Sequence, residues 1–272
     1  MISFVGAGPG AADLITVRGA ARLANADVVV WASSLVPEAV LAHCRAGVAL
    51  HDSATMTLED VLAVYAAHDD AARIVRLHSG DPAIYGAIAE QMDWCLAEER
   101  SFEVVPGVSS VAAAAAALTR ELTIPGVSQS VVLTRLAGRT AASMPPAEGV
   151  AAFAPHGATM AVFLSAARPD ELTAELLCPG SGYGPDTPAA VVVRASWPDE
   201  QIVRTTVGRL ADDLRATGAT MTALVLVGDA LGDAPVRQRS HLYEPGYTTA
   251  YRLRSTAGST QGRPSARRTR DR

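Results

Sequence analysis

Residues 2–13 read ISFVGAGPGAAD, a short apolar run that leads into three glycines at alternate positions, Gly6, Gly8 and Gly10, with Pro9 between the last two. The apolar run predicts a buried β-strand, and the glycines predict a tight turn after it. A turn at the carboxyl end of a parallel strand is where open α/β sheets bind ligands. The stretch therefore predicts an α/β fold with a ligand site beyond its first strand.

Apolar runs alternate with alanine-rich amphipathic stretches through the first 119 residues. Runs rich in valine and isoleucine are typical of strands buried on both faces, so they predict a five-stranded, mostly parallel sheet covered by helices. We expect strands at 2–6, 27–31, 47–50, 73–78 and 102–105, and helices at 16–24, 37–43, 57–66, 82–98 and 109–119.

A second set of strands follows Pro125 and Gly126, which interrupt the pattern after the alanine run. It predicts a second α/β domain over 120–232 after a first domain over 1–119; the alternative is an ordinary loop inside one larger sheet. These strands are expected at 131–134, 159–164, 189–194, 201–204 and 223–228. Residues 233–272 lack periodicity and are rich in arginine, which predicts a basic, disordered tail.

The basic residues exclude several enzyme classes. The chain has 272 residues and a net charge of −5, and all 23 of its lysine-plus-arginine residues are arginine. P-loop nucleotidases, pyridoxal phosphate enzymes and typical kinases each need a lysine. The remaining basic chemistry is bidentate contact of arginine with carboxylates or phosphates.

Other partners are also disfavoured. Neither a signal peptide nor an apolar run long enough to span a membrane is present, so we expect a soluble, cytoplasmic protein without a membrane partner. Cys44, Cys95 and Cys178 are far apart and the histidines lack metal-ligand spacing, so we expect reduced thiols and no metal. The basic tail lacks a recognition motif, and we expect no nucleic acid.

The first glycine turn satisfies the pattern G-x-G-x-x-A of dinucleotide-binding loops, with Ala11 in the last place. Two features oppose that interpretation. The better helix N-cap is Thr16, so the helix dipole lies too far along the chain to meet a pyrophosphate. The second strand ends at Trp31 without an acid for the ribose hydroxyls.

Two further strand ends carry small or polar residues. In LHSGDPAIYG, residues 77–86, Asp81 and Pro82 suit the start of a helix, and Ser79-Gly80 would let the backbone approach a ligand. In VVPGVSS, residues 104–110, either serine suits a helix N-cap, and Val111 stands where a nucleophile elbow needs glycine. The pattern indicates ligand-binding loops at three strand ends without a nucleophile or base.

These motifs, in this order and spacing, resemble the tetrapyrrole methylases, two-domain S-adenosylmethionine enzymes of sirohaem and cobalamin synthesis. The resemblance covers residues 1–232 and includes the first glycine loop, the stretch RLHSGDPAIYG and the stretch VVPGVSS. The stretches ELTIPGVSQSVVLTRLAGRT and WPDEQIVRTTV point to the branch that methylates carbon 11 of precorrin-4. The family often has tyrosine where this chain has Trp31, so a phenol role does not carry over.

The resemblance implies S-adenosyl-L-methionine as cofactor, in a cleft between the domains, an anionic tetrapyrrole as substrate, and a homodimer. By match to the family, substrate contacts are expected at Gly8, Gly10, Arg135 and Arg139. Cofactor contacts are expected at Pro9, Ser79, Gly80, Asp81, Ile84, Ser109, Ser110, Ser165, Ala195 and Ala223.

Three alternatives stay open at this point. The substrate could be the cobalt-containing precorrin-4 of the anaerobic route, or another precorrin or uroporphyrinogen. From a different class, the chain could be a carrier of corrinoid intermediates that has kept the fold.

Overall fold

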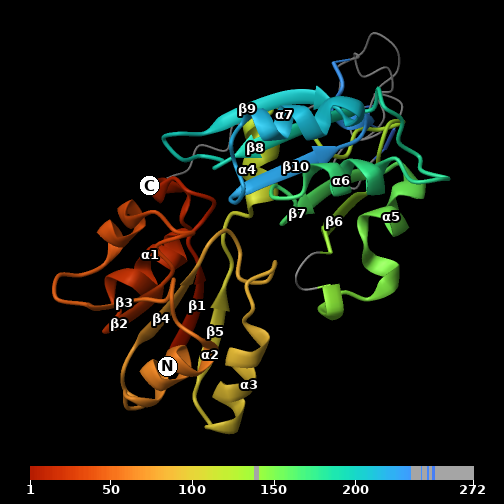
Figure 1. The fold of residues 1–272 in the computed structure, drawn as a ribbon. Helices are drawn as coiled ribbons and strands as arrows, with labels where there is room; N and C mark the ends of the chain where they lie inside the picture. Colours follow the sequence, from red (N-terminus) through yellow and green to blue (C-terminus); the bar gives the residue numbers. More distant parts are fainter. Residues whose placement is uncertain (138–140, 234–239, 241–243, 245–246, 249–272) are drawn as a thin grey trace, which may run out of the picture.

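The computed structural model describes residues 1–137, 141–233, 240, 244 and 247–248. Two five-stranded sheets form the framework, one in the first half of the chain and one in the second (Figure 1). The strands of the first are β1 (Ile2–Gly6), β2 (Val28–Trp31), β3 (Ala49–Asp52), β4 (Ile74–His78) and β5 (Phe102–Val105). Those of the second are β6 (Val131–Arg135), β7 (Thr159–Phe163), β8 (Pro188–Val193), β9 (Gln201–Thr206) and β10 (Ala223–Val227).

In the first half of the chain helices alternate with the strands as predicted, although the one between β2 and β3 is a 3-10 helix; in the second half β8 leads to β9 without a helix. The α-helices are α1 (Val17–Ala24), α2 (Leu58–Ala66), α3 (Ala89–Ala97), α4 (Ser110–Ala117), α5 (Val150–Phe153), α6 (Pro169–Leu176) and α7 (Leu210–Ala216). Short 3-10 helices are η1 (Ala12–Leu14), η2 (Glu38–His43), η3 (Ala141–Ser143), η4 (Pro146–Glu148), η5 (Ala154–His156), η6 (Val207–Arg209) and η7 (Asp229–Leu231). The predicted caps are confirmed at Thr16, which accepts a hydrogen bond from the amide of Gly19, and at Ser109, which accepts one from Val111.

The first sheet is wholly parallel, in the order β3-β2-β4-β1-β5. Because side chains alternate between the faces of a strand, each strand feeds two cores. On one face Val5 packs with residues of α1 and η2, and on the other Phe4 packs with residues of α2 and α3. The predicted five-stranded sheet covered by helices is confirmed, and parallel pairing brings all five carboxyl ends to one edge.

The second sheet is mixed, in the order β6-β7-β10-β8-β9. Only β6 and β7 pair in parallel; the other neighbours are antiparallel. Helices α5, α6 and α7 cover one face, and α4 packs on the other, with Val111 and Ala114 against Ala190 and Leu226. Helix α4 thus follows the first sheet in the chain but is buried against the second (Figure 1). The domain boundary near residue 120 stays a prediction.

The helix expected at 82–98 is wrong in its first part. Helix α3 begins at Ala89; residues 82–85 form a turn, and residues 86–88 are irregular. Tyr85 and Ala87 have φ angles of 55° and 49°, a left-handed conformation that a right-handed helix excludes. Asp81 therefore caps no helix, although its side chain still accepts a hydrogen bond from the amide of Ala83 at 2.8 Å.

Within the described part of the chain, the helices are too short or too polar to cross a bilayer. Most of the predicted tail, including the stretch 249–272, lies outside the described residues.

Candidate functional site

Glycines bring three strand ends of the first sheet together. Gly6 ends β1, Gly80 follows β4 and Gly107 follows β5. A Cβ on Gly6 would lie 2.5 Å from the Cα of Gly107 and 2.6 Å from the carbonyl oxygen of Gly80. A Cβ on Gly107 would lie 2.7 Å from the Cα of Gly6 and closer still to that same oxygen. No side chain fits between these backbones, so packing alone requires glycine at Gly6 and Gly107.

Hydrogen bonds hold the three loops in register. The amide of Gly80 donates to the carbonyl of Gly8 at 2.8 Å, and the amide of Gly8 donates back to the carbonyl of Gly80 at 3.3 Å. Asp81 accepts a hydrogen bond from the amide of Gly107 at 2.9 Å. The carboxylate of Asp81 therefore ties the loop after β4 to the loop after β5, in place of the helix-capping role predicted for it.

A cavity of about 340 Å³ lies where these loops face the second sheet. It falls within the range of small-molecule sites. Nine of the ten residues predicted to contact a cofactor line it: Pro9, Ser79, Gly80, Asp81, Ile84, Ser109, Ser110, Ala195 and Ala223. Residues that are more than 200 positions apart in the sequence thus line one cavity.

The remaining predicted residues lie apart from this cavity. Ser165 lies between Leu164 and Ala166, which line the cavity, but its own side chain is buried, and its hydroxyl donates to the carbonyl of Val162. Gly8 and Gly10 flank Pro9 without lining the cavity themselves. Arg135 lines a neighbouring cavity, and Arg139 lies outside the described residues.

The second sheet contributes a side of the cavity that the sequence analysis largely missed. Its residues come from the loops after β7 and β8 and from the start of β10, because antiparallel pairing brings that start to the same edge. A search of these strand ends for apolar side chains could have found Phe163 and Leu164. The missed lining residues of this side are Phe163, Leu164, Ala166, Val192, Thr220, Met221, Thr222 and Leu224, and Leu35 was missed on the side of the first sheet.

The cavity of Arg135 adjoins the first one. It measures about 480 Å³ and is lined also by Tyr85, Thr134 and Glu148. The ring of Tyr85 packs against Phe163, with ring centroids 4.9 Å apart, and Phe163 lines the first cavity. Burial raises the pKa of Tyr85, and the positive charge of Arg135 opposes that rise. Tyr85 therefore stands between the two cavities as a neutral phenol beside a cation.

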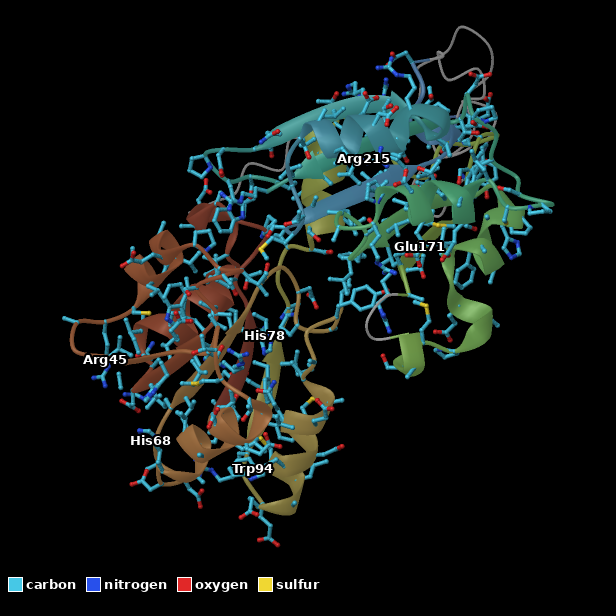
Figure 2. The ribbon with its side chains drawn as sticks, in the orientation of Figure 1. Arg45, His68, His78, Trp94, Glu171 and Arg215 are labelled. Atoms are coloured by element: carbon cyan, nitrogen blue, oxygen red, sulfur yellow. The ribbon has the colours of Figure 1, made fainter. Side chains whose placement is uncertain are left out.

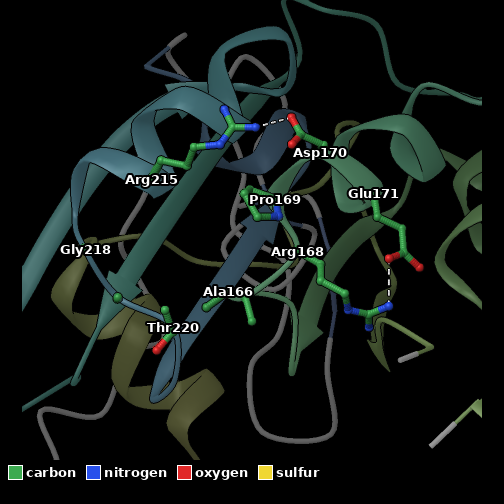
Figure 3. A pocket seen from close by; sticks show the side chains of 10 residues that line it. Ala166, Arg168, Pro169, Asp170, Glu171, Arg215, Gly218 and Thr220 are labelled. Carbon is green, nitrogen blue, oxygen red and sulfur yellow. Dashed lines mark hydrogen bonds and ion pairs between the residues drawn. The ribbon is translucent and has the colours of Figure 1, made fainter. Parts of the chain in front are cut away.

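A surface depression of about 540 Å³ lies on the other side of the second sheet's loops and shares Ala166 and Thr220 with the first cavity (Figure 3). Its charged groups pair with one another. Arg168 contacts Glu171 at 2.7 Å, and Arg215 pairs with Asp170. Each of the four charged side chains in Figure 3 thus has a partner of opposite charge, which is typical of a solvated surface.

One buried histidine lies below the glycine loops. His78 ends β4, directly before Ser79, and its Nε2 has no hydrogen-bond partner among the described residues (Figure 2). Burial, with the nearby charge of Arg76, lowers the pKa of His78 to about 3. The imidazole is therefore neutral at ordinary pH, and its position in the core separates it from the cavity.

Comparisons with known proteins agree with this architecture. The family model for tetrapyrrole (corrin/porphyrin) methylases matches residues 1–211. A precorrin-4 C(11)-methyltransferase of Rhodococcus erythropolis is 47% identical over 231 residues, which cover 85% of this chain and 91% of the relative.

Two solved structures are also similar. A cobalt precorrin-4 methyltransferase of cobalamin biosynthesis shares 44% identity with a TM-score of 0.80, covering 85% of this chain and 95% of its own. A uroporphyrin-III C-methyltransferase of Thermus thermophilus, complexed with S-adenosylhomocysteine, shares 27% identity with a TM-score of 0.68, covering 85% and 98%. The resemblance drawn from the strand-end motifs is confirmed: the chain belongs to the tetrapyrrole (corrin/porphyrin) methylase family.

Proposed function

We propose that this protein transfers a methyl group from S-adenosylmethionine to carbon 11 of precorrin-4, giving precorrin-5 in cobalamin biosynthesis. The observation that carries the proposal is the single cavity into which nine family-matched positions converge from both sheets. The 47% identity to a relative named for this reaction supports the choice of substrate.

The residues of the cavity fit the cofactor. Gly80 has a φ of 65°, which by itself favours glycine, and a Cβ built on it would meet its nearest neighbour, the amide nitrogen of Ser110, only at 3.6 Å, so other protein atoms do not crowd this position. Ser79, Ser110 and Asp81 offer polar groups on one side, and Phe163, Leu164 and Met221 offer apolar surface on the other. This combination suits a ligand with both a charged amino-acid part and an apolar face.

The chain's own contribution is binding and orientation. When bound, S-adenosylmethionine supplies an activated methyl group on its sulfonium, so the protein needs no nucleophile. The walls of the cavity would hold the acceptor carbon in line with that methyl and exclude water. This division of labour explains a site made mainly of backbone, serine and apolar side chains.

The neighbouring cavity suits the acidic side chains of the substrate. The protein carries a net charge of −5, so a tetrapyrrole with many carboxylates needs a local positive site. Arg135 is largely buried, and its Nη2 donates to the hydroxyl of Ser143 at 3.0 Å, which fixes one edge of the guanidinium. We assign Arg135 to a substrate carboxylate.

Calorimetric titration and product analysis test the proposal. The protein should bind S-adenosylhomocysteine saturably, and incubation of precorrin-4 with S-adenosylmethionine should give a product heavier by one methyl group. Binding of NAD in place of S-adenosylhomocysteine would overturn the cofactor assignment. Substrate binding without a change of mass would favour a corrinoid carrier.

The cobalt-containing substrate is the second candidate, favoured by the 44% identity to a cobalt precorrin-4 methyltransferase. Parallel assays with metal-free and cobalt precorrin-4 separate the two, and uroporphyrinogen III serves as the third substrate. Homodimerisation, which the family resemblance implies, and a cytoplasmic location, expected from the composition of the sequence, stay predictions.

Arg135→Ala tests the substrate site. The variant should raise the KM for precorrin-4 about tenfold, because a charged hydrogen bond is lost, while the affinity for S-adenosylhomocysteine stays within twofold. Arg45→Ala is the control: Arg45 pairs with Asp27 on the surface of the first half, away from both cavities (Figure 2). Equal loss of both affinities in Arg135→Ala would mean that Arg135 is structural.

A further inference from the structure

A loop of the second half reaches the first glycine turn. We call residues 194–200 the Trp197 loop and residues 7–11 the Pro9 loop. The indole Nε1 of Trp197 donates to the carbonyl of Pro9 at 3.0 Å, and the hydroxyl of Ser196 accepts from the amide of Ala11 at 3.0 Å. The bonded residues are about 185 positions apart in the sequence, so these are direct bonds between the two halves of the molecule.

Trp197 also explains why position 10 is glycine. A Cβ on Gly10 would lie 2.6 Å from the Nε1 of Trp197, closer still to its Cδ1, and 3.0 Å from the carbonyl oxygen of Ala195. The φ of Gly10 is outside the left-handed region, so its backbone conformation would suit any residue. The indole therefore occupies the space that a side chain at position 10 would need.

The Trp197 loop is held in shape by its own contacts. Arg194 and Ser196 have φ angles of 49° and 64°, which cost free energy in residues other than glycine. The amide of Ser196 donates to the carboxylate of Glu200 at 2.6 Å, and Arg194 pairs with Asp199. The guanidinium of Arg194 also lies 5.3 Å from the centre of the Trp197 ring. These contacts orient the indole towards the Pro9 loop.

Both partners of this contact adjoin residues that line the cavity. Pro9 lines it from the first half, and Ala195, between the two strained residues, lines it from the second. Trp197 and Ser196 do not line the cavity, so they would act on a ligand only through Pro9 and Ala195.

We propose that Trp197 is a positioning residue for methyl transfer: its indole fixes the separation of Pro9 and Ala195 across the cofactor cavity. The inference rests on the proposed function, because it assumes that this cavity binds S-adenosylmethionine. Displacement of one wall by about 1 Å is enough to lower a transfer rate a hundredfold when the reacting atoms must be in line.

Trp197→Phe tests the hydrogen bond while keeping an aromatic ring beside Gly10. The affinity for S-adenosylhomocysteine should fall about tenfold, the equivalent of one lost hydrogen bond. The value of kcat should also fall, by more than any loss of folded protein at the assay temperature can explain, and the melting temperature measures that loss. Trp94→Phe is the matched control, because Trp94, on α3, packs against Tyr65 of α2, far from the second sheet (Figures 1 and 2). It should lower the melting temperature and leave affinity unchanged. Affinity of Trp197→Phe within twofold of the wild type would overturn the proposal.

A double-mutant cycle tests the steric contact independently. Gly10→Ala should lower the affinity for S-adenosylhomocysteine strongly, because its methyl group displaces the indole. Adding Trp197→Leu removes the ring and should bring the double variant close to the affinity of Trp197→Leu alone, with a small remaining loss because the new methyl group also lies 3.0 Å from the carbonyl oxygen of Ala195. If Gly10→Ala lowers the affinity equally in the wild type and in Trp197→Leu, the ligand and not the indole excludes a side chain at position 10, and the proposal fails.

The same cycle separates this inference from the proposed function. Absence of S-adenosylhomocysteine binding in the wild type would reject the proposed cofactor. Melting temperatures of the four proteins would then still report the contact: coupling between Gly10→Ala and Trp197→Leu supports it, and additivity overturns it.

Discussion

The two sides of the cavity are built from different backbone chemistry. On the side of the first sheet, glycines at positions 6 and 107 let three strand ends touch through their backbones. On the side of the second sheet, Leu164 and Thr222 line the cavity in left-handed conformations, with φ angles of 52° and 54°, although neither is glycine. One side is assembled by omitting side chains and the other by keeping them at a conformational cost.

The difference shows what each side needs. A glycine with a second backbone against it cannot be replaced, because no rotamer avoids the contact. A leucine in a left-handed conformation costs about 1–2 kcal/mol, so its side chain must be worth keeping. We infer that the first side is specified by packing and the second by what its side chains offer to a ligand. Substitutions on the two sides should therefore have opposite effects on stability.

Gly107→Ala should produce the largest effect. The new methyl group would overlap the carbonyl of Gly80 and the Cα of Gly6, both of them backbone atoms that cannot move separately from their strands. We expect the free energy of unfolding to fall by about 3 kcal/mol, the upper part of the range for overpacking. Urea unfolding followed by circular dichroism measures the change.

Gly184→Ala is the control for Gly107→Ala. Nothing lies within 4 Å of a Cβ built on Gly184, and its φ lies outside the left-handed region. Its unfolding free energy should stay within about 0.5 kcal/mol of the wild type. Similar values for the two variants would contradict the packing explanation of the first side.

The first sheet also buries His78, which should make the stability of the protein sensitive to acid. The pKa of His78 is lowered to about 3, whereas an unfolded chain has a histidine pKa near 6.5. Above pH 6.5 both states are neutral and the group has no effect. As the pH falls from about 6.5 towards 3, the unfolded state binds the proton first, so stability is lost at about 1.4 kcal/mol per pH unit.

Unfolding in urea between pH 7 and pH 4.5 measures that loss. His78→Leu should be less dependent on pH than the wild type, by about 2 kcal/mol at pH 5. The carboxylates and other histidines titrate in both proteins, so the difference between the two curves isolates His78. Parallel curves would show that His78 binds its proton equally well in the folded protein.

Much of this architecture could be predicted from the sequence. The continuous valine and isoleucine runs predict the buried parallel strands, and Thr16 and Ser109 are N-caps as expected. The parallel arrangement then places the loops after β1, β4 and β5 at one edge without further information. The converging positions Pro9, Ser79 and Ser110 follow from that geometry.

The rest depends on tertiary contacts that have no local signal. Asp81 and Pro82 suit a helix start, yet Asp81 bonds the amide of Gly107, and the chain turns left-handed at Tyr85. The bare position 10 suggests space for a ligand, yet Trp197 fills it from the second half. Such contacts join residues whose proximity only the folded sheets create, so periodicity and spacing cannot reveal them.

The smallest expected effect, and the one of opposite sign, is a gain of stability in Leu164→Asn. Asparagine tolerates the left-handed conformation, and the side chain of Leu164 is 66% exposed, so little burial is lost. We expect the unfolding free energy to rise by about 0.5 kcal/mol while the affinity for S-adenosylhomocysteine falls, because Leu164 lines the cavity. Leu96→Asn is the matched control: Leu96 is 67% exposed but lies within helix α3, where asparagine should cost about 0.5 kcal/mol. If both substitutions destabilise the protein alike, the left-handed conformation at Leu164 carries no cost, and the two sides of the cavity do not differ in the way proposed.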